Sequence, residues 1–149
     1  MSEHRATLTW QRSTEDFAYD TYNRDHEWTF PNGQALRASA APDYLGSEEC
    51  VDPEEAFAAS VASCHMLTFL AIAARKRFTV DTYQDEPVAI LDKNADGVPA
   101  ITRVELRPTV TFSGERVPTG EDISALHEKA HQHCFIANSV KCDVVVVND

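Results

Sequence analysis

The sequence lacks most of the short motifs from which an activity can be assigned. Its four cysteines, at positions 50, 64, 134 and 142, form no C-x-x-C pair, so zinc-ribbon and thioredoxin motifs are absent. It also has no glycine-rich phosphate loop and no G-x-S-x-G nucleophile motif. These absences leave cysteine chemistry, metal binding and ligand binding as the classes to consider.

Positive charge is also scarce. The sequence has 13 Lys and Arg residues against 24 Asp and Glu residues, which gives a net charge of −11. A nucleic-acid-binding protein needs a basic face, and an anionic membrane surface repels so acidic a chain. We therefore expect no nucleic acid and no membrane among its partners. The first residues, MSEHRATLTW, contain no apolar run of a secretion signal, which predicts a cytoplasmic protein with reduced cysteines.

The longest stretch without charged residues covers positions 56–74. A span of about twenty apolar residues can cross a membrane. Seven of these nineteen residues are alanine, however, and the stretch also contains serine, threonine and histidine. We interpret it as a helix of a soluble protein that is buried on nearly all sides. Asp52 as the cap, Pro53 at the first helical position and Glu55 three residues after the cap predict a helix from 52 to about 77.

The length of 149 residues predicts one domain, 1–149. Residues 5–38 hold six of the 13 aromatic residues and predict three or four strands, with a turn at Gly33 and a long loop over 39–52. The other expected elements are strands at 78–91, 101–113 and 144–147, a hairpin loop at 93–97, a helix at 121–133 capped by Thr119, and a break at 134–140. This order predicts an α+β fold.

The segment from His127 to His131, HEKAH, matches the H-E-x-x-H pattern of zinc peptidases. In those enzymes the two histidines bind zinc and the glutamate acts as the base. Only 18 residues follow His131, which leaves little room for a third ligand, and the extended pattern fails at Cys134 and Ala137. We therefore predict no metal site and interpret the segment as a polar helix face, with zinc hydrolysis as a weaker alternative.

Cys64 lies in the middle of the apolar helix. A free cysteine in such a place is most often a small buried hydrophobe, and reactivity requires a neighbour that stabilises its thiolate. His65 points about 100° away on a helix and is a poor partner. Cys134 is either a core thiol or the partner of Cys64. Cys50 and Cys142 are interpreted as core thiols.

Two arginines of the N-terminal half are candidate partners of a thiolate. Arg24 lies in the turn YNRDH, and Arg37 is expected to end the fourth strand. Each can also be an ordinary solvated side chain, so the residues alone do not choose between them.

Three blocks of the sequence resemble the OsmC/Ohr family of osmotically inducible and organic-hydroperoxide-resistance proteins. They are DPEEAFAASVASCHMLTFL at 52–70, HQHCFIANSV at 131–140 and YNRDHEWTF at 22–30. The blocks occur in the family's order along almost the full chain. The resemblance implies an OsmC-like fold, in which antiparallel sheets pack on a long central helix and a second helix within an intertwined dimer.

The resemblance also implies a function. Family members are thiol peroxidases that reduce organic hydroperoxides, so Cys64 matches the peroxidatic cysteine and Cys134 the resolving one. Glu54 matches the family's acidic residue, and Arg24 matches the arginine that pairs with it, with Arg37 as the alternative. We then expect no cofactor and no metal, and an external dithiol, first of all a dihydrolipoyl group, as reductant. The extra Cys50 and Cys142 and the block SCHMLTFL depart from better-known members.

Helix geometry adds a point that does not depend on the family. Ten residues of one continuous helix separate Glu54 from Cys64 by about 15 Å along the axis. Either the helix begins later, or the partners of Cys64 come from a second subunit. We therefore expect a two-fold homodimer with composite active sites. The alternative function is that of a non-enzymatic dimer of the same fold that binds a small apolar ligand.

Overall fold

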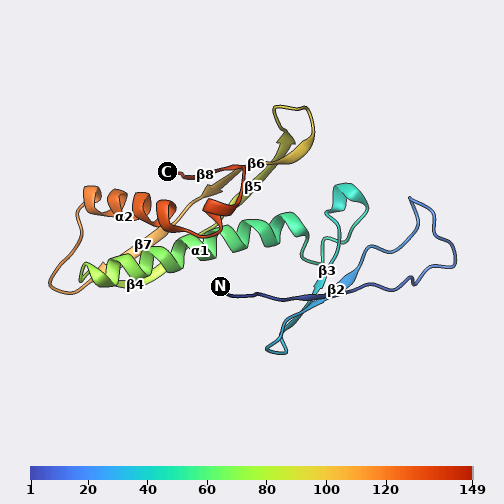
Figure 1. Cartoon of the computed structure of the whole chain (residues 1–149), viewed down its shortest axis with the longest axis horizontal. Helices are drawn as coiled ribbons and strands as arrows, with labels where there is room; N and C mark the ends of the chain where they lie inside the picture. The colour runs from blue at the N-terminus through green and yellow to red at the C-terminus, as the bar shows by residue number, and fades with distance from the viewer. Residues whose placement is uncertain (149) are drawn as a thin grey trace. The chain divides into compact units, whose positions relative to one another are not determined.

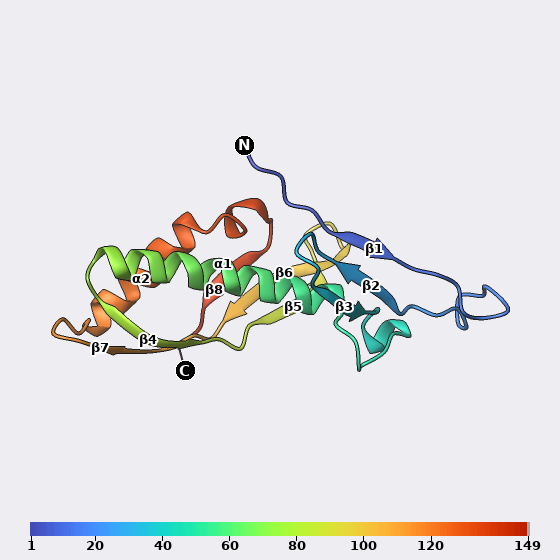
Figure 2. The same cartoon turned by 90° about the horizontal axis from the view of Figure 1, so that it is seen from below.

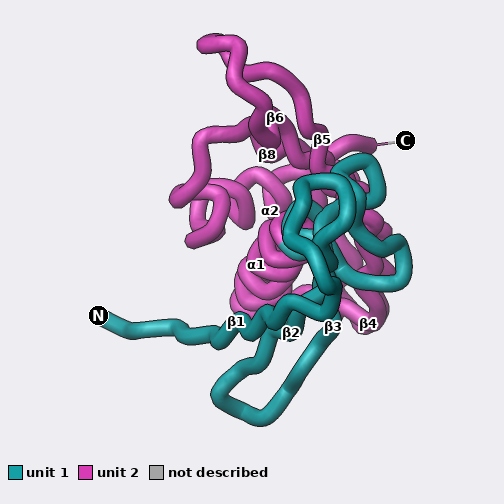
Figure 3. Tube along the Cα trace, turned by 90° about the vertical axis from the view of Figure 1, so that its right-hand side faces the viewer, with its two compact units in different colours: residues 1–56 teal, residues 57–149 magenta. Residues whose placement is uncertain are grey.

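The computed structural model describes residues 1–148, and the chain divides into two compact units, Met1–Ala56 and Phe57–Asp149 (Figure 3). The first unit contains an antiparallel sheet in the order β1-β2-β3, and a short 3-10 helix follows at Pro42–Tyr44. Its strands are β1 (Thr7–Thr9), β2 (His26–Thr29) and β3 (Ala35–Ala38). The turn between β2 and β3 contains Gly33 at φ +86°, a conformation that favours glycine. Of the three or four strands that were predicted, three are present.

The prediction that 5–38 is mostly strand is wrong for residues 10–25, which form a loop between β1 and β2. Asn23 holds this loop together: its side chain donates to the Gln11 carbonyl at 2.9 Å and accepts from the Ser13 N–H at 2.9 Å. Such side-chain bonds compete with a strand ladder. Arg37 consequently lies in the third strand, not in a fourth.

The long helix α1 runs without interruption from Pro53 to Arg75. Its start is as predicted, because the Glu55 N–H donates to Asp52 Oδ1 at 2.8 Å and the Asp52 N–H to the Glu55 carboxylate at 3.4 Å. Its end comes two residues before the predicted Arg77. Arg77 has φ +63°, and the Phe78 N–H donates to the Ala73 carbonyl at 3.0 Å, which closes the helix in a Schellman motif.

The second helix, α2, covers Gly120–His133 and confirms the predicted cap. The Asp122 N–H donates to Thr119 Oγ1 at 3.2 Å, and the Thr119 N–H donates back to the Asp122 carboxylate at 2.9 Å. This reciprocal pair satisfies two amide groups at the start of the helix.

Five strands of the second unit form two sheets, β4-β7 and β5-β6-β8. The strands are β4 (Thr79–Gln84), β5 (Val88–Lys93), β6 (Pro99–Leu106), β7 (Thr109–Ser113) and β8 (Asp143–Val146). Each of the two long predicted strands is therefore split in two, next to Pro87 and Pro108, which lack the N–H that a ladder needs. The expected hairpin between β5 and β6 is present. The pairing of β8 with β6 is parallel, whereas the prediction named antiparallel sheets alone.

The core of the second unit consists of two clusters along α1, which runs beside α2 and the sheets (Figures 1 and 2). In the first cluster Val61 and Ala62 pack against Val104 and Leu106 of β6 and against Val144 of β8. In the second cluster, buried residues of the two helices pack together with Phe78, which precedes β4. The helix residues are Phe69 and Ala73 of α1 and Leu126 and Ala130 of α2. The central helix and the α+β class are as predicted.

One side of α1 is exposed in the single chain. Ser63, Leu67 and Ala71, spaced four residues apart, are exposed, and Leu67 keeps 60% of its surface. The prediction of a helix buried on nearly all sides is therefore wrong for one chain alone. By length and composition α1 is also the one helix in the described part of the chain that is long and apolar enough to cross a membrane. Its buried residues in both core clusters favour the interpretation as a core helix.

Candidate functional site

Two cysteines from distant parts of the sequence meet in the second unit. Cys64 comes from the middle of α1 and is half-buried, and Cys134 follows the end of α2 and is fully buried. Both are free thiols. Burial raises the pKa of Cys134, and a hydrogen bond with Cys64 adds to the rise. Cys134 therefore stays a protonated thiol at neutral pH, near the more accessible Cys64.

The turn after α2 holds Cys134 in place through its backbone. The Asn138 side chain donates to the carbonyls of Cys134 at 2.9 Å and Gln132 at 3.0 Å, and Ser139 donates to the Phe135 carbonyl at 2.7 Å. The Gln132 carbonyl belongs to the last turn of α2 and has no partner within the helix, so Asn138 caps the C-terminal end of α2, and Ser139 closes the turn that follows. The Ala137 N–H donates to Cys134 Sγ at 3.4 Å. The motif CFIANS thus fixes the position of the buried thiol.

Arg24 lies in the first unit, in the loop before β2. Its guanidinium donates to the Tyr22 carbonyl at 2.6 Å and to the Tyr19 carbonyl, and it stands 3.7 Å from the centre of the Tyr22 ring. An arginine over an aromatic face gains a cation–π attraction. A cavity of about 440 Å³ opens beside it, lined mainly by Trp10, Phe17, Tyr22, His26 and Pro53. Arg24 therefore borders an aromatic cavity.

The other predicted residues of the first unit have different surroundings. Glu54 occupies the first turn of α1 and is half-buried. Arg37, the alternative to Arg24, is exposed and forms an ion pair with Asp25 at 3.5 Å. An exposed pair of this kind contributes little to stability. The catalytic roles of Arg24, Glu54, Cys64 and Cys134 stay predictions.

The HEKAH segment lies on α2, and its interpretation as a polar helix face is incomplete. His127 is half-buried: its ring stacks on His65 with centroids 5.3 Å apart, and its Nδ1 lies 3.0 Å from His65 Nε2. The partner of His65 is thus a histidine of α2 rather than Cys64. Among residues 1–148 no group of three or more His, Cys, Asp or Glu side chains is arranged to hold a metal ion.

Two features of these sites are not predicted from the sequence. The aromatic residues before position 31 suit strands by their type, whereas Phe17 and Tyr22 line the cavity beside Arg24. The HEKAH segment draws attention to His127, but the partner of His127 is His65 on α1, which lies 62 residues earlier in the sequence. Only the packing of the two helices shows that pair.

Comparisons with known proteins agree with this architecture. The model of the OsmC-like protein family matches residues 46–147. No curated protein matches the sequence. Among solved structures, an OsmC-like protein of unknown function from Vibrio cholerae is 48% identical, with 99% of each chain covered and a TM-score of 0.95.

Two more distant structures share the fold. An organic hydroperoxide resistance protein from Elizabethkingia anophelis is 19% identical, with 100% of this chain and 98% of that chain covered and a TM-score of 0.74. The organic hydroperoxide resistance protein OhrB of Bacillus subtilis is 18% identical, with 97% and 96% covered and a TM-score of 0.66.

Proposed function

Because the chain belongs to the family of OsmC-like proteins, we propose that it is a cysteine-based peroxidase that reduces organic hydroperoxides to alcohols. The observation that carries this proposal is that Cys64 on α1 lies close enough to the buried Cys134 after α2 to raise the pKa of its thiol. A half-buried thiol beside a fully buried one is the arrangement that a peroxidatic and a resolving cysteine need. The names of the hydroperoxide resistance proteins with the same fold agree with it.

The proposed reaction has two steps. The Cys64 thiolate attacks one oxygen of the hydroperoxide, the O–O bond breaks, and the alkoxide leaves and takes a proton to become the alcohol. Cys64 is then a sulfenic acid. The sulfur of Cys134 attacks that sulfur, the S–O bond breaks, water leaves, and a disulfide forms. An external dithiol, first of all a dihydrolipoyl group, reduces the disulfide, so the cycle needs no bound cofactor and no metal.

Arg24 and Glu54 are the proposed partners of this chemistry. A guanidinium favours a nearby thiolate and donates to a peroxide oxygen, and a carboxylate orients it through paired hydrogen bonds. The aromatic cavity beside Arg24 supports the assignment to Arg24 rather than to the exposed, ion-paired Arg37.

The apolar walls of this cavity suit the organic part of a lipid-type hydroperoxide. The free cysteines support a place in the cytoplasm.

A homodimer is part of the proposal. The exposed side of α1 presents Leu67 between small residues, and a second copy of the chain would remove this surface from water. The axial separation of about 15 Å between Glu54 and Cys64 on one helix supports active sites that combine residues of two subunits. Light scattering at micromolar concentration should give the mass of a dimer; a monomer would contradict this part of the proposal.

The test of the activity is peroxide consumption with cumene hydroperoxide and dihydrolipoamide. We expect turnover in the wild type, none in Cys64→Ser, and one equivalent of alcohol without further turnover in Cys134→Ser. Cys142→Ser, a half-buried thiol of the same unit, serves as the matched control and should keep its activity. If the wild type shows no turnover and Cys64 remains a free thiol after peroxide treatment, the peroxidase proposal fails.

That outcome would favour the second candidate, a non-enzymatic dimer that binds a small apolar ligand. The cavity of about 440 Å³ with Trp10, Phe17 and Tyr22 in its wall supports this candidate. Its volume and apolar walls are in the range of small-molecule sites.

A further inference from the structure

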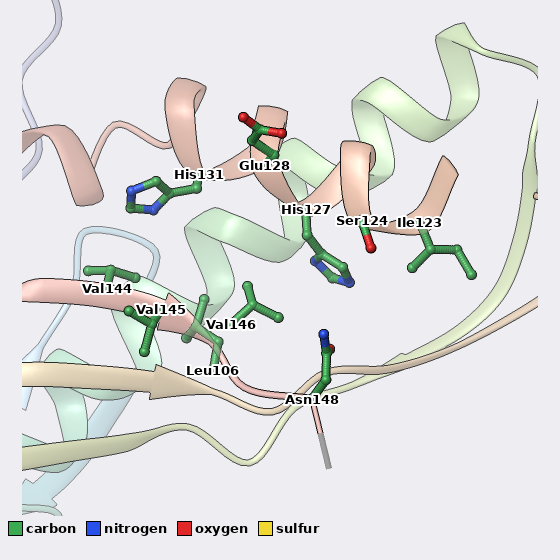
Figure 4. A pocket seen from close by; sticks show the side chains of 10 residues that line it. All are labelled: Leu106, Ile123, Ser124, His127, Glu128, His131, Val144, Val145, Val146 and Asn148. Carbon is green, nitrogen blue, oxygen red and sulfur yellow. The ribbon is translucent and has the colours of Figure 1, made fainter. Parts of the chain in front are cut away.

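A second cavity lies in the second unit, between α2 and the strands β6 and β8, and the proposed peroxidase does not use it. Its volume is about 330 Å³. Leu106, Ile123 and Val146 contribute apolar walls, and Ser124, His127 and Asn148 contribute polar groups (Figure 4). The side chains of His127 and Asn148 point toward one another across it. An apolar cavity with a few converging polar groups is the usual form of a small-molecule site.

The hydrogen-bonding state of His127 follows from its partner. His65 Nε2 lies 3.0 Å from His127 Nδ1, while His65 Nδ1 is buried without a hydrogen-bond partner among the described residues. A buried N–H without a partner costs more than an unused lone pair. His65 therefore carries its hydrogen on Nε2 and donates it to His127 Nδ1. His127 then carries its own hydrogen on Nε2, the nitrogen that remains for a ligand.

Packing and charge restrict the ligand further. The His127 ring is held between His65 and Phe69, whose ring centroid is 4.5 Å away, so the donor is fixed in direction. Burial lowers the pKa of His127, which keeps the imidazole neutral at neutral pH. The net charge of −11 disfavours an anion. The site therefore offers the fixed N–H donor of His127, the imidazole of His131, a hydroxyl and an amide among apolar walls.

We propose that this cavity binds a small, mostly apolar molecule through a neutral hydroxyl or carbonyl oxygen that accepts the Nε2–H of His127. Ser124 and Asn148 are placed to contact the same oxygen or a second polar group of the ligand. The site is separate from the Cys64–Cys134 pair and does not depend on the peroxidase proposal.

The test is calorimetric titration with 2-naphthol as the probe. We expect binding to the wild type, about tenfold weaker binding to His127→Phe, which keeps the ring but removes the donor, and no binding to Ser124→Trp, which fills the cavity from an exposed position. Lys129→Gln, an exposed change on the same helix, and Cys64→Ser should both bind like the wild type. The anion 2-naphthoate should bind more weakly than 2-naphthol.

A second measurement covers the case that His127→Phe does not fold. In nitrogen NMR of the wild type, 2-naphthol should shift the Nε2 signal of His127 and leave that of the exposed His4 unchanged. The proposal is overturned if 2-naphthol does not bind, if Ser124→Trp binds it like the wild type, or if 2-naphthoate binds at least as tightly. It is also overturned if Phe17→Ala, in the other cavity, abolishes the binding.

Discussion

The two units of the chain hold their candidate functional residues by different means. In residues 57–149, two clusters of buried side chains surround α1, and the Cys64–Cys134 pair belongs to elements that these clusters fix. In residues 1–56 few side chains are buried: Ala38, Ser39, Cys50 and Asp52. Arg24 is held there by carbonyl groups and aromatic rings of its own loop.

This difference in burial matches two requirements of the proposed reaction, disulfide formation in the second unit and substrate binding in the first. Forming a disulfide requires two sulfur atoms in contact, and a close-packed core holds them at one separation. Binding varied hydroperoxides requires a surface that adapts, and a loop with few buried contacts opens at low cost in free energy. Apart from the two cysteines, changes to the buried core of the second unit should therefore act mainly on stability, and changes to the loop around Arg24 mainly on activity.

The largest effect should come from the core of the second unit. Phe69→Ala removes a fully buried ring that packs against Tyr83, Phe112 and His127, and should lower the free energy of unfolding by about 3–5 kcal/mol. Leu36→Ala, at a half-buried position of β3, is the matched change in the first unit and should cost about 1 kcal/mol. Urea denaturation measures both, and equal losses would remove the contrast between the units.

A loss of nearly the same size should appear on acidification. Burial, then the charges of His127 and His131, lowers the pKa of His65 from 6.5 to about 4. The unfolded chain therefore takes up a proton below pH 6.5 that the folded chain refuses until about pH 4. The free energy of unfolding should therefore be about 3 kcal/mol higher above pH 6.5 than at pH 4. This difference is lost progressively as the pH falls from 6.5 toward 4.

Denaturation at pH 7 and pH 4.5 measures this dependence. His65→Phe should flatten the profile, whereas His4→Gln, at the exposed N-terminus, should leave it unchanged. A wild-type profile that matches that of His65→Phe would show that His65 does not titrate with folding.

In the first unit the expected effect is on catalysis. Arg24→Lys keeps the charge but removes the planar guanidinium, and should lower kcat/KM for cumene hydroperoxide by about a hundredfold with little change in stability. Arg37→Lys is the control and should keep full activity, because that side chain is exposed and paired with Asp25. The reverse pattern would assign the catalytic arginine to position 37.

The smallest effect should come from a helix cap. Thr119→Ala removes the acceptor of the Asp122 N–H and should cost about 1 kcal/mol in thermal or urea unfolding. Thr119→Ser keeps the hydroxyl and should restore most of that loss. No difference between the two variants would mean that water replaces the cap at this helix end.

Local signals in the sequence predict much of this fold. Asp52 and Thr119 mark both helix starts, and each forms the expected reciprocal pair of hydrogen bonds. Errors arise where a local pattern competes with bonds from elsewhere in the chain. The aromatic residues of 10–25 suit a strand, but the Asn23 side chain ties that segment into a loop. Pro87 and Pro108 interrupt strands whose side-chain alternation continues past them.

By itself, the sequence determined the α+β class, the central helix, the two caps and the family, because each depends on residues close together along the chain. Tertiary structure alone decided which side chains meet. The proximity of Cys64 to Cys134, the stacking of His65 on His127 and the parallel pairing of β8 with β6 all join distant segments. The physical reason is that these segments come together through the burial of α1 against α2 and the sheets. Hydrophobic burial depends on the apolar area removed from water and not on how far apart two residues are in the sequence.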